Sequence, residues 1–355
     1  MKRGVMLRAV PDRSLDEILS KVSRSFYLSL AILPRAMRTQ LSAAYLVARA
    51  ADTIADTRLV QAERRIELLG GMRKALHDPQ AIGPYVSDVG AELRAPDAAA
   101  PYDDKSEAER VLLTRLGDCL RRMSDFDSAD RDRARKVLDT LITGMERDLV
   151  RFVEGGPLVA LETLADLDEY TYMAAGCVGE YWTVMTAAHV PTVRRLARPD
   201  FVARGVRLGK ALQLVNVIRD AAQDLAQGRC YIPRALLATH GLTPEALRDP
   251  GQRRRARPVL DELRGLALAH IDAAFPYVMA IPRWEPRLRL AALWPLWIGL
   301  GTLEKLAATD DPLDPAAAVK IGRGDVYRIL AESSMAVGVD RALTTLHERR
   351  RRRAG

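Results

Sequence analysis

Residues 208–233 decide the fold, and they read LGKALQLVNVIRDAAQDLAQGRCYIP. No proline or glycine stands between Lys210 and Gln227, and the composition favours a helix. Four polar residues recur in this helix at spacings of three, four and four: Gln213, Asn216, Asp220 and Asp224. This spacing places all four on one helical face. Because the remaining positions are largely apolar, the helix is predicted to be buried.

A second polar stripe lies in residues 41–57, LSAAYLVARAADTIADT. Its members follow spacings of four, three and four: Tyr45, Arg49, Asp52 and Asp56. If the two helices face each other, four carboxylates converge on one cavity, with Arg49 and Arg219 beside them. Buried carboxylates lose hydration and repel one another, so a cation is expected there. Oxygen ligands in this arrangement suit Mg²⁺ completed by substrate phosphate, and the implied ligand is a diphosphate.

Two of these patterns allow a structural interpretation beside the functional one. An isolated Asp-x-x-x-Asp pair is usually part of a solvated face. Here each pair lies in an apolar helix and shares its stripe with other polar residues, which favours a functional role. Small residues between positions 174 and 179 either serve close helix contact or leave room for a flat ligand.

The overall composition predicts an all-α protein. Of its 355 residues, 48% are hydrophobic, enough to bury a large core. Almost every long segment has a helical period, and the alternation typical of strands is rare. Residues 78–104 differ, because Pro79, Pro84, Pro96 and Pro101 predict a loop.

Cysteine usage and hydropathy indicate a cytoplasmic protein without a membrane anchor. Cys119, Cys177 and Cys230 lack metal-ligand spacing, and their odd number gives no disulfide framework, which suits a reducing compartment. The N-terminus has no signal-peptide core. The longest apolar run, residues 290–303, contains a proline and is too short to span a bilayer.

The net charge of +8 is concentrated in basic patches. Arg253–Arg255 with Arg257 form one patch, and Arg349–Arg353 form a run of five arginines. That run is either a disordered, solvated end or a surface that attracts anionic lipid headgroups, placing the protein at the inner membrane surface. No nucleic-acid partner is predicted, because no aromatic platform or recognisable motif accompanies the patches. A monomer is favoured.

The stretch 208–233 resembles the second signature of the squalene and phytoene synthases. The residues that carry this likeness are Gln213, Asn216, Arg219, Asp220, Asp224, Arg229, Tyr231 and Pro233. Three other segments resemble conserved blocks of the family in the same order: SRSFYLSLAILP (23–34), YLVARAADTIAD (45–56) and YTYMAAGCVGEYW (170–182). The resemblance runs from about Ser23 to Pro233 and more weakly to Val326. The departures at Thr171, Ala174 and Ala221 bear on packing and chain-length selection more than on activity.

The resemblance implies a single-domain class I isoprenoid synthase, a helical bundle with a central cavity. Residues 1–13 are expected to be an N-terminal extension, 14–340 the synthase domain, and 341–355 a basic tail. The implied activity joins two farnesyl diphosphates head to head with Mg²⁺, or Mn²⁺ as an alternative, and reduces presqualene diphosphate to squalene with NADPH. Alternative products, formed without reduction, are phytoene, dehydrosqualene, hydroxysqualene or presqualene diphosphate. An alternative of another class is a non-catalytic helical assembly protein.

The resemblance also implies roles for individual residues. The expected metal ligands are Asp52, Asp56, Asn216, Asp220 and Asp224. The expected diphosphate contacts are Arg24, Ser25, Arg49, Gln213, Asn216, Arg219 and Arg229. The implied catalytic residues are Tyr45, Asp52, Tyr172 and Asp220, with Tyr172 managing a proton or cation. The segment VKIGRG (319–324) resembles a cofactor-binding segment of squalene synthases, which assigns NADPH to Lys320 and Arg323 together with Asn216.

Overall fold

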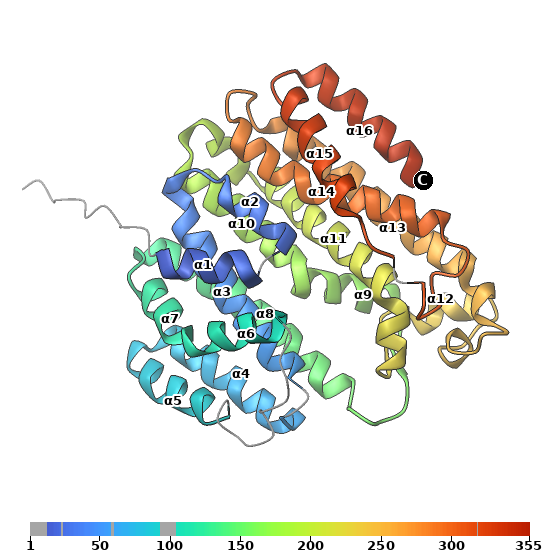
Figure 1. Ribbon diagram of the computed structural model, residues 1–355, viewed down its shortest axis with the longest axis horizontal. Coiled ribbons are helices and arrows are strands. Elements are labelled where there is room, and N and C mark those ends of the chain that lie inside the picture. Colours follow the sequence, from blue (N-terminus) through green and yellow to red (C-terminus); the bar gives the residue numbers. More distant parts are fainter. Residues whose placement is uncertain (1–12, 23, 58–59, 93–103, 318) are drawn as a thin grey trace, which may run out of the picture.

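The computed structural model describes residues 13–22, 24–57, 60–92, 104–317 and 319–355, which form a bundle of helices (Figure 1). The α-helices are α1 (Arg13–Val22), α2 (Arg24–Ala31), α3 (Arg35–Asp56), α4 (Ala62–His77), α5 (Ile82–Glu92), α6 (Asp104–Thr114), α7 (Leu116–Ser124), α8 (Ser128–Arg151), α9 (Leu164–Thr171), α10 (Cys177–His189), α11 (Pro199–Ala226), α12 (Arg234–Thr239), α13 (Arg257–Ala280), α14 (Pro286–Ala308), α15 (Arg323–Ala336) and α16 (Asp340–Ala354). Shorter elements are the 3-10 helices η1 (Pro79–Ala81), η4 (Pro191–Ala197), η5 (Glu245–Leu247) and η6 (Arg253–Ala256), the π-helix η3 (Tyr172–Gly176), and the strands β1 (Val159–Ala160) and β2 (Arg229–Cys230). The all-α prediction is confirmed. No helix in the described part of the chain is both long enough and apolar enough to cross a membrane.

Helix α11 is the central element of the bundle and packs against α10, α13 and α14. It begins at Pro199, where the missing backbone N–H costs no helical hydrogen bond. Its buried residues lie on several sides of the helix, because neighbours surround it: Leu208, Leu214, Val215, Val217, Ile218 and Leu225 are among them. In Figure 1, helices α3 to α8 lie to one side of the bundle, and α11, α13, α14 and α16 lie to the other.

Two glycine contacts hold α11 close to η3 and α10. A Cβ added to Gly179 would lie 2.0 Å from the carbonyl oxygen of Gly205. A Cβ added to Gly209 would lie 2.1 Å from the carbonyl oxygen of Ala175. No side chain fits at either position, so close helix contact is one role of these small residues. Ala175 and Gly179 also line an apolar cavity, so they leave room for a ligand as well.

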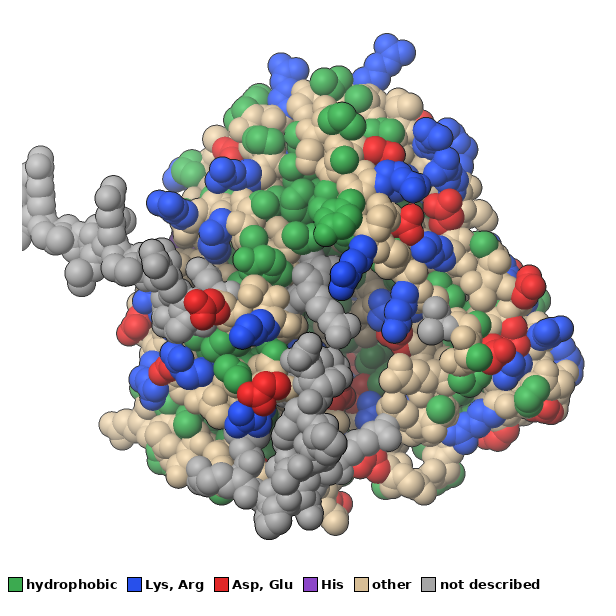
Figure 2. Space-filling model, viewed as in Figure 1, with side chains coloured by type: hydrophobic (Ala, Val, Ile, Leu, Met, Phe, Trp, Pro, Cys, Tyr) green, Lys and Arg blue, Asp and Glu red, His purple; other side chains and the backbone are tan. Residues whose placement is uncertain are grey.

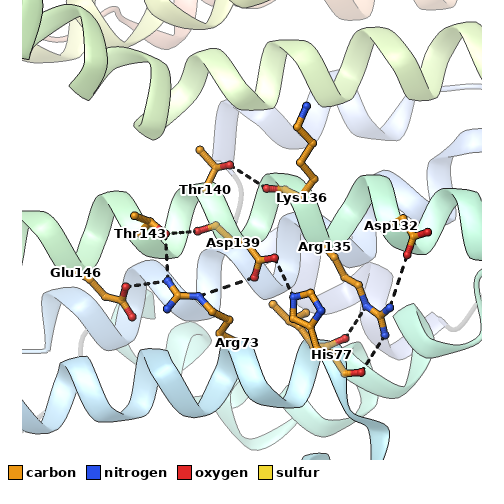
Figure 3. Close-up of polar contacts among 10 residues, drawn as sticks. Arg73, His77, Asp132, Arg135, Lys136, Asp139, Thr140, Thr143 and Glu146 are labelled. Atoms are coloured by element: carbon orange, nitrogen blue, oxygen red, sulfur yellow. Dashed lines mark hydrogen bonds and ion pairs between the residues drawn. The ribbon is translucent and has the colours of Figure 1, made fainter.

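A network of ion pairs holds α4 against the outer face of α8 (Figure 3). Arg73 lies 2.8 Å from the Glu146 carboxylate and 3.9 Å from that of Asp139. The His77 Nε2 atom lies 2.8 Å from Asp139, and Arg135 donates to a backbone carbonyl at the end of α4 at 2.8 Å. These contacts add to the apolar packing of α8, in which Leu138 and Ile142 are fully buried.

A helix forms where the sequence predicts a loop. α5 covers Ile82–Glu92 because Ile82, Tyr85 and Val89, spaced three and four apart, are buried on one face. Pro84 lies in the first turn, where its missing N–H breaks no helical bond. Elsewhere in the predicted loop, η1 forms before α5 and Asp104 begins α6, while residues 93–103 lie outside the described residues.

The arginine run near the C-terminus is helical. Within α16, His347 is buried, stacks on Phe275 of α13 with ring centroids 3.6 Å apart, and accepts a hydrogen bond from Trp297 Nε1 at 3.3 Å. Residues 341–355, predicted as a separate basic tail, therefore pack onto the bundle. The interpretation of the run as a disordered end is wrong, because apolar and aromatic contacts order it.

Candidate active site

Two adjoining cavities lie among α3, α8, η3 and α11. The polar cavity has a volume of about 240 Å³ and the apolar cavity a volume of about 470 Å³. Four residues line both: Asp52, Leu141, Met145 and Ala174. Figure 2 shows a hollow near the centre of one face of the molecule, with acidic side chains inside it and basic side chains at its edge.

The first acidic stripe, on α3, reaches both cavities. Asp52 lies at their shared boundary and Asp56 lines the polar cavity. Tyr45 and Arg49 line the apolar cavity. Arg49 forms ion pairs with Asp52 and, at 2.5 Å, with Glu109 of α6. One helix thus presents carboxylates to the polar cavity and a phenol to the apolar one.

The second stripe lies on α11. Gln213 lines the polar cavity, and Asn216, which donates to the Gln213 side chain at 3.3 Å, lines the apolar cavity. The Asp220 carboxylate is bound by its neighbour Arg219, with the Arg219 Nε atom at 2.7 Å. Asp220 and Asp224 do not belong to the lining of either cavity.

The carboxylates of the two stripes nevertheless interact. Burial raises the pKa of Asp224 to about 7, and repulsion from Asp220 adds to this rise. Asp148 and Asp56 raise the pKa of Asp224 further, while Arg229 opposes the shift. Because Asp56 lies on α3 and Asp224 on α11, the negative potential extends from one acidic helix to the other.

Sequence reasoning missed Asp148, on the inner face of α8. This carboxylate lines the polar cavity and accepts a hydrogen bond from the Tyr231 hydroxyl at 2.8 Å. Burial raises the pKa of Asp148 to about 6, although the Tyr231 hydrogen bond and Arg229 act to lower it. Its sequence neighbours Glu146, Arg147 and Arg151 are charged, so the local pattern is that of a solvated face and gives no signal of a buried acid.

Sequence reasoning also missed Tyr170, two residues before the predicted catalytic Tyr172. Tyr170 lines the polar cavity, stacks on Tyr231 with ring centroids 4.3 Å apart, and accepts a hydrogen bond from Gln213 Nε2 at 2.9 Å. Tyr172 lines neither cavity and donates to Glu180 at 3.0 Å instead. Side chains two residues apart on a helix point to nearly opposite sides, so both tyrosines cannot face the carboxylates. The placement of Tyr172 gives its predicted catalytic role no support.

Arg229 enters the polar cavity through a sharp turn after α11. Gly228 has a φ of +84°, in the left-handed region that favours glycine, and it ends the helix. The chain then forms β2, in which Arg229 is the parallel partner of Val159 in β1. Arg229 lines the polar cavity and lowers the pKa values of Asp148 and Asp224. It is therefore the predicted diphosphate contact with the clearest place in the cavity.

The remaining predicted site residues lie elsewhere. Lys320 and Arg323 are exposed and line neither cavity, and the Lys320 carbonyl accepts a hydrogen bond from Lys305 at 3.2 Å. They do not fit a nicotinamide site within these cavities. The backbones of Arg24 and Ser25 belong to α2, and their side chains lie outside the described part of the structure.

The polar cavity carries an excess of negative charge that suits a bound cation. Its charged lining residues are the acids Asp52, Asp56, Asp148, Asp166 and Glu169 and the bases Arg147, Arg151 and Arg229. Among the described residues, no three His, Cys, Asp or Glu side chains lie close enough to hold a metal ion by themselves. Mg²⁺ needs only one or two carboxylates and completes its shell with water and phosphate. The donor set therefore fits Mg²⁺ shared with a bound diphosphate.

Comparison with known proteins agrees with this chemistry. The squalene/phytoene synthase family matches residues 19–325. A 15-cis-phytoene synthase of Enterobacter agglomerans is 37% identical over 133 residues, 38% of this chain and 40% of that protein. Squalene synthase BSS of Botryococcus braunii is 25% identical over 323 residues, 90% of this chain and 64% of that protein. A solved complex of TcSQS with the ligand BPH1237 has a TM-score of 0.74 at 25% identity, covering 94% of this chain and 89% of that one. The chain spans less than two thirds of the length of both curated relatives.

Proposed function

Because the chain belongs to the squalene/phytoene synthase family, we propose that it joins two farnesyl diphosphates head to head and, with Mg²⁺ and NADPH, yields squalene. The observation that carries this proposal is the acidic polar cavity that adjoins an apolar cavity at Asp52. A prenyl diphosphate has the same division into an anionic head and an apolar chain. One substrate molecule therefore suits both cavities at once.

The anionic heads would be held by carboxylates through the metal and by arginines directly. The residues that would hold the metal are Asp52 and Asp56 of α3 together with Asp220 and Asp224 of α11. Bound Mg²⁺ supplies a Lewis acid that stabilises the leaving diphosphate. Arg49 and Arg219 pair with carboxylates of the two stripes, so both guanidinium groups lie beside the residues that would hold the metal and would donate to phosphate oxygens. Arg229 completes the set from β2.

The apolar cavity would bind the prenyl chains and exclude water. Trp182 and Tyr277 are among its lining residues, and their aromatic faces stabilise positive charge. Breaking one carbon–oxygen bond releases diphosphate and leaves an allylic cation. Carbon 1 of that cation bonds to carbons 2 and 3 of the second chain, and loss of one proton gives a cyclopropylcarbinyl diphosphate. Burial raises the pKa of Tyr170, so its hydroxyl stays neutral and hydrogen-bonds in the polar cavity.

One comparison supports squalene as the end product. The likeness to the Botryococcus squalene synthase extends over 90% of this chain.

A phytoene-type product, formed without reduction, is the second candidate. The 37% identity to the Enterobacter phytoene synthase favours it, although it covers only 133 residues. The exposed positions of Lys320 and Arg323, away from both cavities, favour it as well.

The proposal is tested by product analysis. The purified protein is incubated with Mg²⁺ and either farnesyl or geranylgeranyl diphosphate, with and without NADPH, and the lipid extract is examined by mass spectrometry. Asp52→Asn protein serves as the matched inactive control. Squalene formed from farnesyl diphosphate only with NADPH is the expected result.

The other outcomes separate the alternatives. A thirty-carbon product that forms equally without NADPH contradicts the reductive step and indicates dehydrosqualene, hydroxysqualene or presqualene diphosphate. Phytoene from geranylgeranyl diphosphate establishes the second candidate. If neither substrate is consumed, the proposed activity is overturned and a non-catalytic assembly role takes its place.

A further inference from the structure

A third cavity, the α14–α16 pocket, lies apart from the candidate active site. It has a volume of about 370 Å³ and is formed by α14, α15 and α16, which lie together at one side of the bundle in Figure 1. Its basic lining residues are Lys305, Arg328, Arg349, Arg350 and Arg353. Its acidic lining residues are Glu304, Asp325 and Glu332. None of these side chains lines the polar or the apolar cavity.

Helical periodicity divides the arginine run of α16 between two faces. Arg351 faces α13, where its Nε and Nη2 atoms lie 2.8 and 3.0 Å from the Asp272 carboxylate. Arg349, Arg350 and Arg353 line the pocket instead. Arg349 and Arg353 are four residues apart, so their charges repel each other on one helical face. One arginine of the run holds α16 to the bundle, and three others meet at a cavity.

Arg350 is a fixed part of the pocket wall. It forms an ion pair with Glu332 of α15, and its guanidinium carbon lies 4.8 Å from the ring centroid of Trp297. The Arg350 side chain is only 14% exposed. Its buried Nε atom has no hydrogen-bond partner within the part of the chain that the structure describes. A rigid, aromatic-backed guanidinium is a better anion ligand than a mobile surface arginine, because less side-chain entropy is lost on binding.

The pocket retains positive charge after its internal ion pairs are formed. Lys305 lies 2.8 Å from Asp325, and Arg350 pairs with Glu332. Arg349 and Arg353 form no ion pair with the described residues and are exposed. With five basic and three acidic side chains, the lining has an excess of two positive charges.

We propose that the α14–α16 pocket binds a phosphate-bearing anion. A phosphate monoester carries between one and a half and two negative charges near neutral pH, roughly the excess charge of the pocket. The planar fork of an arginine matches two phosphate oxygens, and Arg349 and Arg353 both have donors available for it. Bound phosphate also removes the repulsion between these two arginines. The phosphate belongs either to a soluble anion or to the headgroup of an anionic lipid.

Binding is measured on the full-length protein with two probes. Inorganic diphosphate is titrated by calorimetry in EDTA, which removes the divalent cation that a diphosphate needs in the acidic cavity. Vesicles of phosphatidylglycerol mixed with phosphatidylcholine, and of phosphatidylcholine alone, are tested by flotation. The pocket variant is Arg349→Gln with Arg353→Gln. The matched control is Arg341→Gln with Arg352→Gln, two exposed arginines of α16 outside the pocket, so the same charge is removed.

The pocket variant is expected to bind at least tenfold more weakly than the wild type, while the control binds within about twofold. Loss of diphosphate binding identifies a soluble anion as the ligand class. Loss of flotation with phosphatidylglycerol, without any diphosphate binding, identifies a lipid headgroup. Equal weakening in the pocket variant and the control means that total charge alone matters and overturns the proposal. If the wild type binds neither diphosphate nor the phosphatidylglycerol vesicles, the proposal is overturned as well.

Discussion

The two faces of α8 use carboxylates in opposite ways. On the outer face, Asp139 and Glu146 lie seven residues apart and each has a basic partner from α4 at 2.8 Å. Asp148 is nine residues from Asp139, which is about two and a half helical turns, so it lies on the opposite, inner face. Its hydrogen-bond donor is the phenol of Tyr231. Burial raises the pKa of Asp148 to about 6. The outer carboxylates stabilise the fold, whereas the inner one destabilises it unless a cation binds.

Removing Asp224, the α11 carboxylate that Asp148 of the inner face repels, is expected to have the largest effect. Asp224→Asn should lower turnover about 10³-fold, because it removes a carboxylate proposed to hold the metal, which would be worth several kcal/mol in the transition state. In EDTA the same variant should be more stable by about 1–3 kcal/mol, because a buried and repelled charge is removed. Steady-state kinetics and urea unfolding measure the two effects.

Asp139→Asn is the control for this prediction, since it removes one carboxylate from the outer face. Turnover should stay within about twofold of the wild type, and stability should fall by no more than about 1 kcal/mol. Equal loss of turnover in the two variants would contradict the distinction between the faces.

Substitutions of Tyr170 and Tyr172 are expected to change turnover less than the loss of Asp224. Tyr170→Phe removes the hydroxyl that Gln213 contacts in the polar cavity and should lower turnover about 10- to 100-fold. Tyr172→Phe breaks only the hydrogen bond to Glu180 and should leave turnover within about twofold. Both are measured at saturating substrate with Mg²⁺. The reverse order of effects would restore the role predicted for Tyr172.

The sequence predicts the features that depend only on the spacing of residues within one helix. The stripes on α3 and α11 follow from helical spacing alone. That spacing predicts that Asp52, Asp56 and Gln213 face a shared cavity, and all three residues line the polar cavity. The all-α class follows from the same periodicity.

Residues that depend on long-range packing could not be predicted. Asp148 lies among charged neighbours, and the residues it interacts with in the cavity, Arg229 and Tyr231, come from a distant segment. The choice between Tyr170 and Tyr172 depends on the rotation of α9 and η3 against α11. The order of α16 depends on contacts of His347 with α13 and α14, because its arginine run is typical of a solvated end.

The inner carboxylates should also make stability depend on pH. The pKa of Asp224 is about 7 in the folded protein and roughly 4 in the unfolded chain. Between these values the folded state holds a proton that the unfolded state has lost, so stability falls as pH rises. From pH 5 to 8 in EDTA, the wild type should lose about 1–3 kcal/mol relative to Asp224→Asn. Thermal unfolding across this range measures the difference.

Mg²⁺ with inorganic diphosphate provides the control for the pH dependence. The bound cation stabilises the ionised carboxylates, so the difference between wild type and variant should shrink above pH 7. Parallel stability curves in EDTA would show that Asp224 has an ordinary pKa and that Asp148 and Asp220 do not repel it.

Breaking the outer network is expected to have the smallest effect. Arg73→Gln removes the contacts to Asp139 and Glu146, but Arg73 is 35% exposed, so the loss should be about 0.5–1 kcal/mol and should diminish at high salt. Turnover should not change, because the buried side chains of Leu138 and Ile142 hold α8 in place without the ion pairs. Leu138→Ala should cost about 2–5 kcal/mol by the same measurement. If Arg73→Gln instead lowered turnover tenfold or more at an unchanged melting temperature, the outer network would be setting the position of Asp148. The two faces of α8 would then act as one unit.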